Sequence, residues 1–371
     1  MHNYLFLLLF QVLVIGLSSD GDDTMERLEF APPWPCGTFY ENKKVNLSTV
    51  ESLVGGRRKG QQSLVKDARN VRCGFMQPTD MELAHTLSLL QQRNDCPIVL
   101  ATTIFNNYDK FNHAVPPEHA ENSTCFFTFM DKATCVGQKV GTKHQCNISG
   151  TAFNIFRHGV WNVVVIDVCR FRLEDIRRAS RIPKMLGHRF FPEAHYFISI
   201  DAREKIMTKP TQIIQQFLIQ TNKQFLAQQH PSRSARSVYD EGNLVARVRL
   251  AAASDIQAQL ERYKNESLPN NHRPSVHEMG FFAYDLRSND IKAMLCAWFD
   301  EYMLGSVRDQ VCWSFVVWKL SLTHRIHSVP YREMNPKFIL KGAHRTHRSK
   351  SIPIACPSYN PLQENGEETS C

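Results

Sequence analysis

Residues 97–109 read PIVLATTIFNNYD, an apolar and β-branched run that ends in a polar loop. A continuous apolar run of this length predicts a strand that is buried on both faces, as in a parallel sheet. Three similar runs follow, at 125–130, 161–167 and 195–200. A basic helical stretch at 173–191 lies between the last two of them. Strands that alternate with helical stretches indicate an α/β fold with a largely parallel sheet covered by helices on both faces.

The remaining apolar spacing predicts helices before and after these strands and one more short strand. We therefore expect a single main domain. The expected helices are 81–93, 211–224, 254–263, 291–302 and 309–320, and the expected short strand is 281–284.

Polar residues follow several of the expected strands at their carboxyl ends. The first strand leads into Asn107, Tyr108 and Asp109, the second ends at Asp131, and the fourth ends at Asp201. In open α/β sheets, ligands bind in the crevice beyond the carboxyl ends of the strands. These residues are therefore candidates for a binding site, although a carboxylate at the end of a strand can also be a helix cap.

The amino-terminal residues predict entry into the secretory pathway. Residues 4–17 read YLFLLLFQVLVIGL, without a charge, and small residues follow them. Because spanning a bilayer takes about 20 apolar residues, the run predicts a cleavable signal peptide over 1–19, with a short uncut anchor as the alternative. Four Asn-x-Ser/Thr sequons are expected glycosylation sites of a lumenal protein. They are Asn46, Asn122, Asn147 and Asn265.

The eleven cysteines are scattered rather than arranged as paired CxxC motifs. This distribution favours disulfides in an oxidising lumen over a zinc site. Cys135 and Cys146 bracket a polar loop, so we predict a local disulfide between them. The odd total leaves at least one thiol unpaired or paired between chains.

Composition divides the rest of the chain. Residues 20–70 are polar and include PPWP at 32–35, which indicates a stem or linker. The main domain is expected over 71–325 and a basic tail over 326–371. The net charge of +8 is moderate, and much of it lies in the basic run 341–350. Such a run would suggest nucleic acid in a nuclear protein, but in a lumenal one it meets acidic glycans, phosphates or water. We expect no nucleic-acid partner, and membrane contact only through the amino-terminal segment.

Residues 181–201 read RIPKMLGHRFFPEAHYFISID, and this stretch resembles the glycosyltransferase-like domain of the plant turgor-regulation-defect and mucilage-related proteins. The resemblance extends from about residue 71 to residue 318, with a further match of basic residues at 344–350. The other blocks that carry it are 71–75, 103–109, 125–131, His230, 237–242, 259–264, 296–301 and 308–310.

The resemblance implies a GT-A-like fold and a hexosyltransferase of the Golgi lumen or a secreted one. Such an enzyme moves a sugar from a nucleotide-sugar donor to a glycan or glycoconjugate acceptor. Asp201 would hold a divalent cation, Mn²⁺ or Mg²⁺, that bridges the donor phosphates. The usual Asp-x-Asp pair is incomplete because Ser199 occupies its first position. His277 and Asp131 are candidates for the missing ligand, and a site without metal is the alternative.

The same resemblance suggests roles for the other candidates. Lys184 and His188 are four residues apart on one helix face and would grip the diphosphate together with Arg308, or simply form a solvated basic face. Asp309 would orient or deprotonate the acceptor hydroxyl, or cap its helix. The remaining expectations place Tyr108 and Asp109 at the base and ribose, and His230 with 239–242 in a loop that closes over the donor.

Two other functions remain open. Some relatives have been described as alkaline ceramidases, but the chain has no series of apolar spans, no HExxH and no Gly-x-Ser-x-Gly. The incomplete acidic pair also allows a degenerate transferase that binds a glycan or assists another enzyme.

Overall fold

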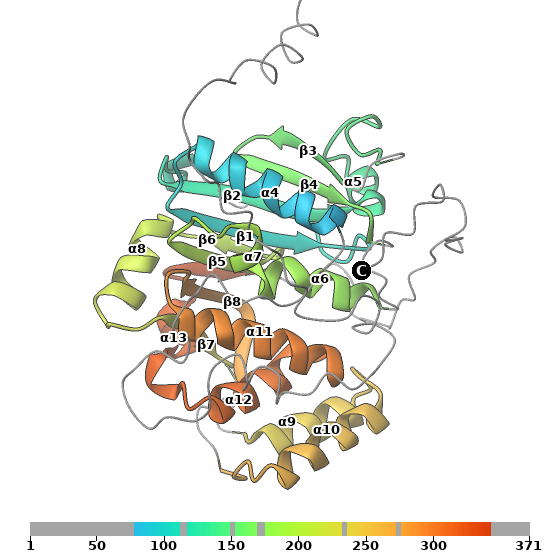
Figure 1. The fold of residues 1–371 in the computed structure, drawn as a ribbon, viewed down its shortest axis with the longest axis vertical. Coiled ribbons are helices and arrows are strands. Elements are labelled where there is room, and N and C mark those ends of the chain that lie inside the picture. Colours follow the sequence, from blue (N-terminus) through green and yellow to red (C-terminus); the bar gives the residue numbers. More distant parts are fainter. Residues whose placement is uncertain are drawn as a thin grey trace, which may run out of the picture. The chain divides into compact units, whose positions relative to one another are not determined.

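The computed structural model describes residues 78–111, 117–148, 153–168, 175–231, 236–271 and 276–342. They all belong to one compact unit, in which a mixed eight-stranded sheet of order β3-β4-β2-β1-β5-β8-β7-β9 lies between helices (Figure 1). Its strands are β1 (Ile98–Ile104), β2 (Thr124–Asp131), β3 (Phe153–His158), β4 (Trp161–Ile166), β5 (Tyr196–Asp201), β7 (Phe225–Gln229), β8 (His277–Asp285) and β9 (Ile326–Val329). A separate two-stranded sheet joins β6 (Glu204–Ile206) to β10 (Ile339–Lys341).

The centre of the large sheet is parallel, which confirms the predicted α/β class. Strands β4, β2, β1 and β5 pair in parallel, whereas β3 and β8 pair antiparallel with their neighbours. β2 and β4 are buried along their whole lengths. This burial explains why their sequences are largely apolar on both faces instead of alternating.

Two hydrophobic clusters cover the two faces of the sheet. In β1, Val99 and Ala101 belong to one cluster while Ile98 and Leu100 belong to the other, because successive side chains point to opposite faces. The first face carries α4 (Pro78–Arg93), α6 (Ile176–Met185), α7 (Gly187–Phe190), α9 (Val238–Arg247), α10 (Ala253–Asn265), α11 (Asn289–Leu304) and α12 (Asp309–Lys319). The second carries α5 (Lys132–Gly137), α8 (Pro210–Ile214), the π-helical turn η5 (Gln215–Ile219) and α13 (Tyr331–Met334). Short 3₁₀ turns are η3 (Pro117–His119) and η6 (Thr323–Arg325).

Several elements differ from the sequence prediction. The helix expected over 173–191 is interrupted at Leu186 and becomes α6 and α7. A Cβ on Gly187 would lie 2.4 Å from the Tyr284 hydroxyl, so the chain packs here at a distance that only glycine allows. The helix expected over 211–224 ends earlier, as α8 and η5, and β8 is longer than the short strand expected at 281–284.

Two short strands extend the fold beyond the predicted domain boundary at residue 325. β9 pairs in parallel with β7 inside the large sheet, and β10 pairs antiparallel with β6. These strands of four and three residues are too short to give a periodic signal, so the sequence indicated a basic tail instead. Four predictions concern residues outside the part that the structure describes. They are the signal peptide or anchor at 1–19, the stem at 20–70, the sequon at Asn46 and the part of the expected tail beyond residue 342.

Two disulfides join pairs of described cysteines in the first half of the domain. Cys135–Cys146 confirms the predicted local pair, and Cys96–Cys125 connects the segment before β1 to the start of β2. Asn122, Asn147 and Asn265 are exposed, as glycan attachment requires, and their glycosylation stays a prediction. None of the helices in the described part of the chain is both long and apolar enough to cross a lipid bilayer.

Candidate functional site

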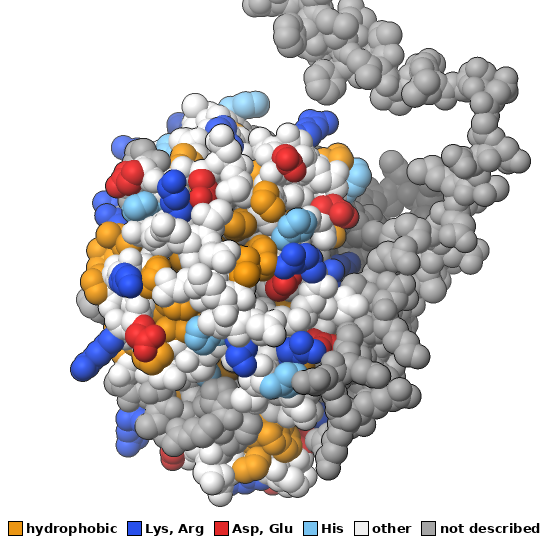
Figure 2. Space-filling model, turned by 90° about the vertical axis from the view of Figure 1, so that its left-hand side faces the viewer, with side chains coloured by type: hydrophobic (Ala, Val, Ile, Leu, Met, Phe, Trp, Pro, Cys, Tyr) orange, Lys and Arg blue, Asp and Glu red, His pale blue; other side chains and the backbone are white. Residues whose placement is uncertain are grey.

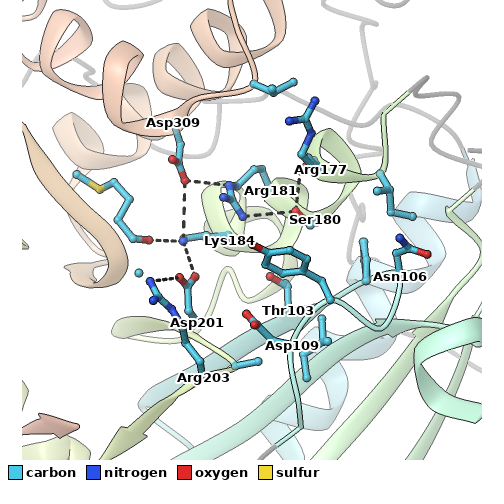
Figure 3. Close-up of a pocket in the computed structure, with 18 of the residues that line it drawn as sticks. Thr103, Asn106, Asp109, Arg177, Ser180, Arg181, Lys184, Asp201, Arg203 and Asp309 are labelled. Atoms are coloured by element: carbon cyan, nitrogen blue, oxygen red, sulfur yellow. Dashed lines mark hydrogen bonds and ion pairs between the residues drawn. The ribbon is translucent and has the colours of Figure 1, made fainter. Parts of the chain in front are cut away.

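A cavity of about 210 Å³ opens at the carboxyl ends of β1 and β5, beside the first residues of β8. From β1 the chain proceeds to β2 and β4 on one side, and then returns to the other side of β1 as β5. The cavity therefore lies at the topological switch point of the sheet, where α/β proteins bind their ligands. Charged and polar side chains from β5, α6, α12 and the loop after β1 point into it (Figure 3).

The loop after β1 is built to present Tyr108 and Asp109 to this cavity. Asn106 and Asn107 have φ values of 54° and 53°, a left-handed conformation that asparagine tolerates better than most residues. The Asn106 amide donates to Asp131 Oδ2 at 2.9 Å, and the other oxygen of Asp131 accepts from the Thr134 amide at the start of α5. Asp131 therefore acts as a helix cap and a loop anchor, and it is not among the residues that line the cavity.

Lys184 on α6 lies at the centre of the site and is only 3% exposed (Figure 3). Its ammonium lies 3.1 Å from Asp201 Oδ1 and 4.0 Å from Asp309 Oδ2, and it also donates to the Met279 carbonyl. A buried charge requires such partners. Burial alone would raise the pKa of Asp201, but Lys184, Arg203 and Arg181 together hold that pKa well below its ordinary value.

Asp309 begins α12 and is paired with a second cation. Arg181 Nε lies 2.8 Å from Asp309 Oδ2, while Asp309 Oδ1 accepts from the Gln310 amide at 3.0 Å. Burial alone would lower the pKa of Arg181, and Asp309 raises it above its ordinary value. Asp309 thus fulfils the structural role expected at a helix start and also faces the cavity.

A third group of charges lies beyond the end of β5. Arg203 Nη2 is 3.7 Å from Asp201 Oδ2 and 3.8 Å from Glu278 Oε1, and Glu278 Oε2 accepts from Lys341 at 2.6 Å. Next to them Glu204 is buried, and burial together with Asp201 and Glu278 raises its pKa to about 8. A Cβ on Gly280 would lie 2.6 Å from Glu204 Oε1, so β8 approaches these carboxylates as only glycine can.

The cavity brings together six of the eight residues predicted for catalysis or donor binding. Sequence reasoning missed Arg181 and Arg203, although the first is one helical turn before Lys184 and the second is two residues after Asp201. The predicted residues that line the cavity are Tyr108, Asp109, Lys184, Asp201, Arg308 and Asp309, and the further polar or charged ones are Thr103, Asn106, Arg177, Ser180, Arg181, Arg203, Glu278 and Gln310.

The two predicted histidines do not line the cavity. His188 is buried in the core with Nε2 3.5 Å from Cys296 Sγ, and burial lowers its pKa well below 6.5. Its expected contact with the diphosphate is therefore wrong. His230 Nε2 lies 3.8 Å from Glu278 Oε2, so the imidazole contacts a residue of the cavity wall without being part of it.

The expected mobile loop at 239–242 is the first part of α9. Ser237 and Asp240 form a capping box that starts this helix, and Tyr239 is buried with its hydroxyl donating to the Leu268 carbonyl. The polar residues that indicated a loop are those of a helix amino terminus, and closure of this segment over the donor stays a prediction.

The residues around Asp201 do not fit a divalent cation. Mg²⁺ and Mn²⁺ need carboxylate oxygens that are free to coordinate, but Asp201 and Asp309 face Lys184, Arg181 and Arg203. His277 is not among the lining residues, shares a hydrogen bond with Ser328, and has its pKa lowered to about 3 by burial. Across the described ranges, no group of three or more His, Cys, Asp or Glu residues is arranged to hold a metal ion.

Comparison with known proteins assigns the chain to a family. The model of the TOD1/MUCI70 glycosyltransferase-like domain matches residues 40–343. The chain belongs to the TOD1/MUCI70 family. This membership confirms the resemblance seen in the sequence, and glycosyltransferase is the enzyme class that it supports.

Two relatives of this TOD1/MUCI70 chain come from Arabidopsis thaliana. "Probable hexosyltransferase MUCI70" is 30% identical over 269 residues, which are 68% of this chain and 43% of the relative. "Alkaline ceramidase TOD1" is 25% identical over 253 residues, which are 66% of this chain and 53% of the relative. The chain therefore spans about half the length of these relatives.

Two solved structures also show similarity. The WbbM bifunctional glycosyltransferase gives a TM-score of 0.39 at 13% identity, over 63% of this chain and 39% of that protein. Mouse xyloside xylosyltransferase 1 gives a TM-score of 0.37 at 11% identity, over 62% of this chain and 84% of that protein.

Proposed function

We propose that this chain is a hexosyltransferase-like enzyme that transfers a sugar from a nucleotide-sugar donor to a glycan or glycoconjugate acceptor. The observation that carries the proposal is the charged cavity at the switch point between β1 and β5. A diphosphate and a sugar need such a combination of cations, carboxylates and hydroxyls. The disulfides of the described residues, together with the amino-terminal segment, support a place in the secretory pathway, as a Golgi or secreted protein.

The roles follow from where each side chain enters the cavity. Tyr108 and Asp109, on the loop after β1, would contact the base and ribose, and the cations near β5 and α12 would contact the diphosphate. Asp201 stays ionised because of its two cations, and an anion beside the anomeric carbon stabilises the positive charge that develops there.

In the transfer step, the acceptor oxygen bonds to the anomeric carbon as the bond from that carbon to the donor phosphate breaks. The electron pair of the broken bond leaves with the nucleoside diphosphate. The hydroxyl proton passes to a carboxylate, for which Asp309 is placed at the cavity wall opposite the β1 loop.

Donor binding by the purified chain tests this proposal. A panel of nucleotide sugars is screened by thermal shift, because a ligand that binds only the folded state raises the melting temperature. We expect one donor to stabilise the chain and Asp201→Asn to abolish sugar transfer from it, while exposed Glu261→Gln on α10 behaves as wild type. A folded chain that binds no donor, or a fully active Asp201→Asn variant, would contradict the proposal.

The name of the second relative makes ceramide a necessary comparison substrate. Hydrolysis of an N-acyl amide needs an apolar channel for the acyl chains, whereas this cavity of about 210 Å³ is small and its lining includes nine charged residues. We therefore expect no release of fatty acid from ceramide under conditions in which the sugar donor is bound.

A further inference from the structure

We propose that the cavity neutralises the donor diphosphate with its own cations, Arg203 and Arg308 supported by Lys184, and that transfer requires no divalent metal. This inference rests on the proposed function and specifies how the same site would bind its donor. It also replaces the divalent cation expected from the family resemblance.

The carboxylate expected to bind metal is already neutralised by protein cations. Lys184 faces Asp201 Oδ1 at 3.1 Å, and Arg203 faces Asp201 Oδ2 at 3.7 Å. Lys184 is fixed in place because its ammonium also donates to the Met279 carbonyl and is 3% exposed. A divalent cation at Asp201 would stand next to two like charges in a partly buried site, where their repulsion is strong.

Arg308 is the cation best placed to receive an anion. It donates to Gln310 Oε1 at 3.1 Å, and no carboxylate of the described chain lies within ion-pair distance of it. Its buried Nε has no acceptor among these residues. Buried donors normally have partners, so a guanidinium whose buried Nε lacks an acceptor in a cavity wall indicates a ligand that supplies acceptor oxygens.

Arg203, which also lines the cavity, shows the same property. Its ion pairs with Asp201 and Glu278, at 3.7 and 3.8 Å, are longer than direct hydrogen bonds, and its buried Nε also lacks an acceptor among the described residues. Arginine binds phosphate through two parallel N–H donors, so a loosely held guanidinium can turn toward the ligand.

The position of Tyr108 indicates that both arginines face one space. Tyr108, Arg203 and Arg308 all line the same cavity. Burial and Asp109 raise the pKa of the Tyr108 hydroxyl, while Arg203 and Arg308 act in the opposite direction, which agrees with this placement. Arg308 also directly precedes α12, whose amino terminus favours an anion. The charge that the leaving diphosphate gains would therefore develop between two arginines.

Titration of the full chain with its donor, and with the free nucleoside diphosphate, tests this proposal by calorimetry. We expect equal dissociation constants, within about threefold, in excess EDTA and in Mn²⁺. In EDTA, Arg203→Gln and Arg308→Gln are each expected to weaken binding about tenfold or more. Arg308→Lys keeps the charge but not the paired donors, so its dissociation constant should lie between those of the wild type and Arg308→Gln. Arg247→Gln on α9 is exposed and serves as the matched control.

The outcomes separate the two proposals. Binding and transfer that disappear in EDTA and return with Mn²⁺ would overturn metal independence and leave the transferase function standing. Unchanged binding by folded Arg203→Gln and Arg308→Gln variants would also overturn it. Absence of donor binding in both buffers would contradict the proposed function itself.

Discussion

Lys184 links three parts of the chain that meet at the cavity, because its ammonium contacts Asp201, Asp309 and the Met279 carbonyl. Replacing it by Met leaves the two carboxylates with one cation fewer. Removing one partner of a buried pair is strongly destabilising, so we expect Lys184→Met to lower the free energy of unfolding by about 3 kcal/mol. Urea denaturation at neutral pH measures this change, and exposed Lys209→Met is the control. Equal midpoints for both variants would contradict the assigned role.

Glu204 gives the domain a defined pH dependence. Burial, with Asp201 and Glu278, raises its folded-state pKa from 4.5 to about 8. Between these values the folded chain keeps a proton that the unfolded chain loses, so stability falls as the pH rises, by at most about 1.4 kcal/mol per pH unit. Glu204→Gln lacks this proton. The free energy of unfolding of the variant minus that of the wild type should therefore increase from about pH 5 to about pH 8.

Denaturant unfolding across this pH range checks the expectation for Glu204. Glu261→Gln on the exposed side of α10 should follow the wild type at each pH. Parallel pH profiles for Glu204→Gln and the wild type would show that Glu204 is not protonated in the folded state.

At the scale of elements, β8 is the strand that closes the cavity. Its pairing with β7 shifts register between Ala227 and Gln228, and Gly280 lies within the irregular part. A Cβ there would lie 2.6 Å from Glu204 Oε1 and 3.0 Å from Asp201 Oδ2. We expect Gly280→Ala to displace these carboxylates, to destabilise the chain by about 1–3 kcal/mol and to weaken donor binding roughly tenfold.

A second substitution distinguishes this contact from a general effect on β8. Glu204→Asp shortens the side chain that the new Cβ would meet, so the double variant should regain part of the stability lost in Gly280→Ala. If the loss of stability in the double variant equals the sum of the losses in the two single variants, the strain caused by Gly280→Ala does not arise from contact with Glu204.

The elements that sequence reasoning predicted are those with strong local signals. β1, β2 and β4 are continuously apolar because helices cover both faces of the sheet, and their limits were close to those observed. β7 was missed because its sequence, FLAQQ, is short and ends in polar residues, although β8 and β9 flank it. Its burial comes from pairing with segments distant in sequence, which no local pattern shows.

The same distinction between local and long-range signals applies to the residues of the candidate site. Asp201 and Asp109 were found because each follows a strand that the sequence reveals. Arg181 and Arg203 were missed because their relevance depends on distances to Asp309 and Asp201 across the cavity. His188 was misplaced because helical spacing gave it the same face as Lys184, whereas the helix breaks at Leu186 between them.

At the scale of the whole molecule, the described surface mixes charges of both signs. Figure 2 shows one face, on which Lys and Arg side chains are interspersed with Asp, Glu and hydrophobic ones. A nucleic-acid-binding face would instead gather positive charge in a patch or stripe. That the chain has no nucleic-acid partner stays a prediction, and the mixed charges on this face are consistent with it.

The carboxyl-terminal limit of the domain leads to the last prediction. Residues 326–342 add β9 to the edge of the large sheet and β10 to β6, and they bury Val329 and Ile339 in the second cluster. They also bring Lys341 to within 2.6 Å of Glu278 in the cavity wall. A chain that ends at residue 325 would expose β7 as an unpaired edge and leave Glu278 with only its longer ion pair to Arg203.

We therefore expect the chain that ends at residue 325 to lose cooperative thermal unfolding, followed by circular dichroism, and to aggregate. A chain that ends at residue 343, where the family match also ends, should keep the melting temperature of the full chain to within a few degrees. The two chains differ by less than a twentieth of the sequence, so a difference in folding would arise from these two strands and their contacts. Cooperative unfolding of the shorter chain at an unchanged temperature would instead show that β9 and β10 are an appendage, and that the basic tail begins where the sequence first indicated.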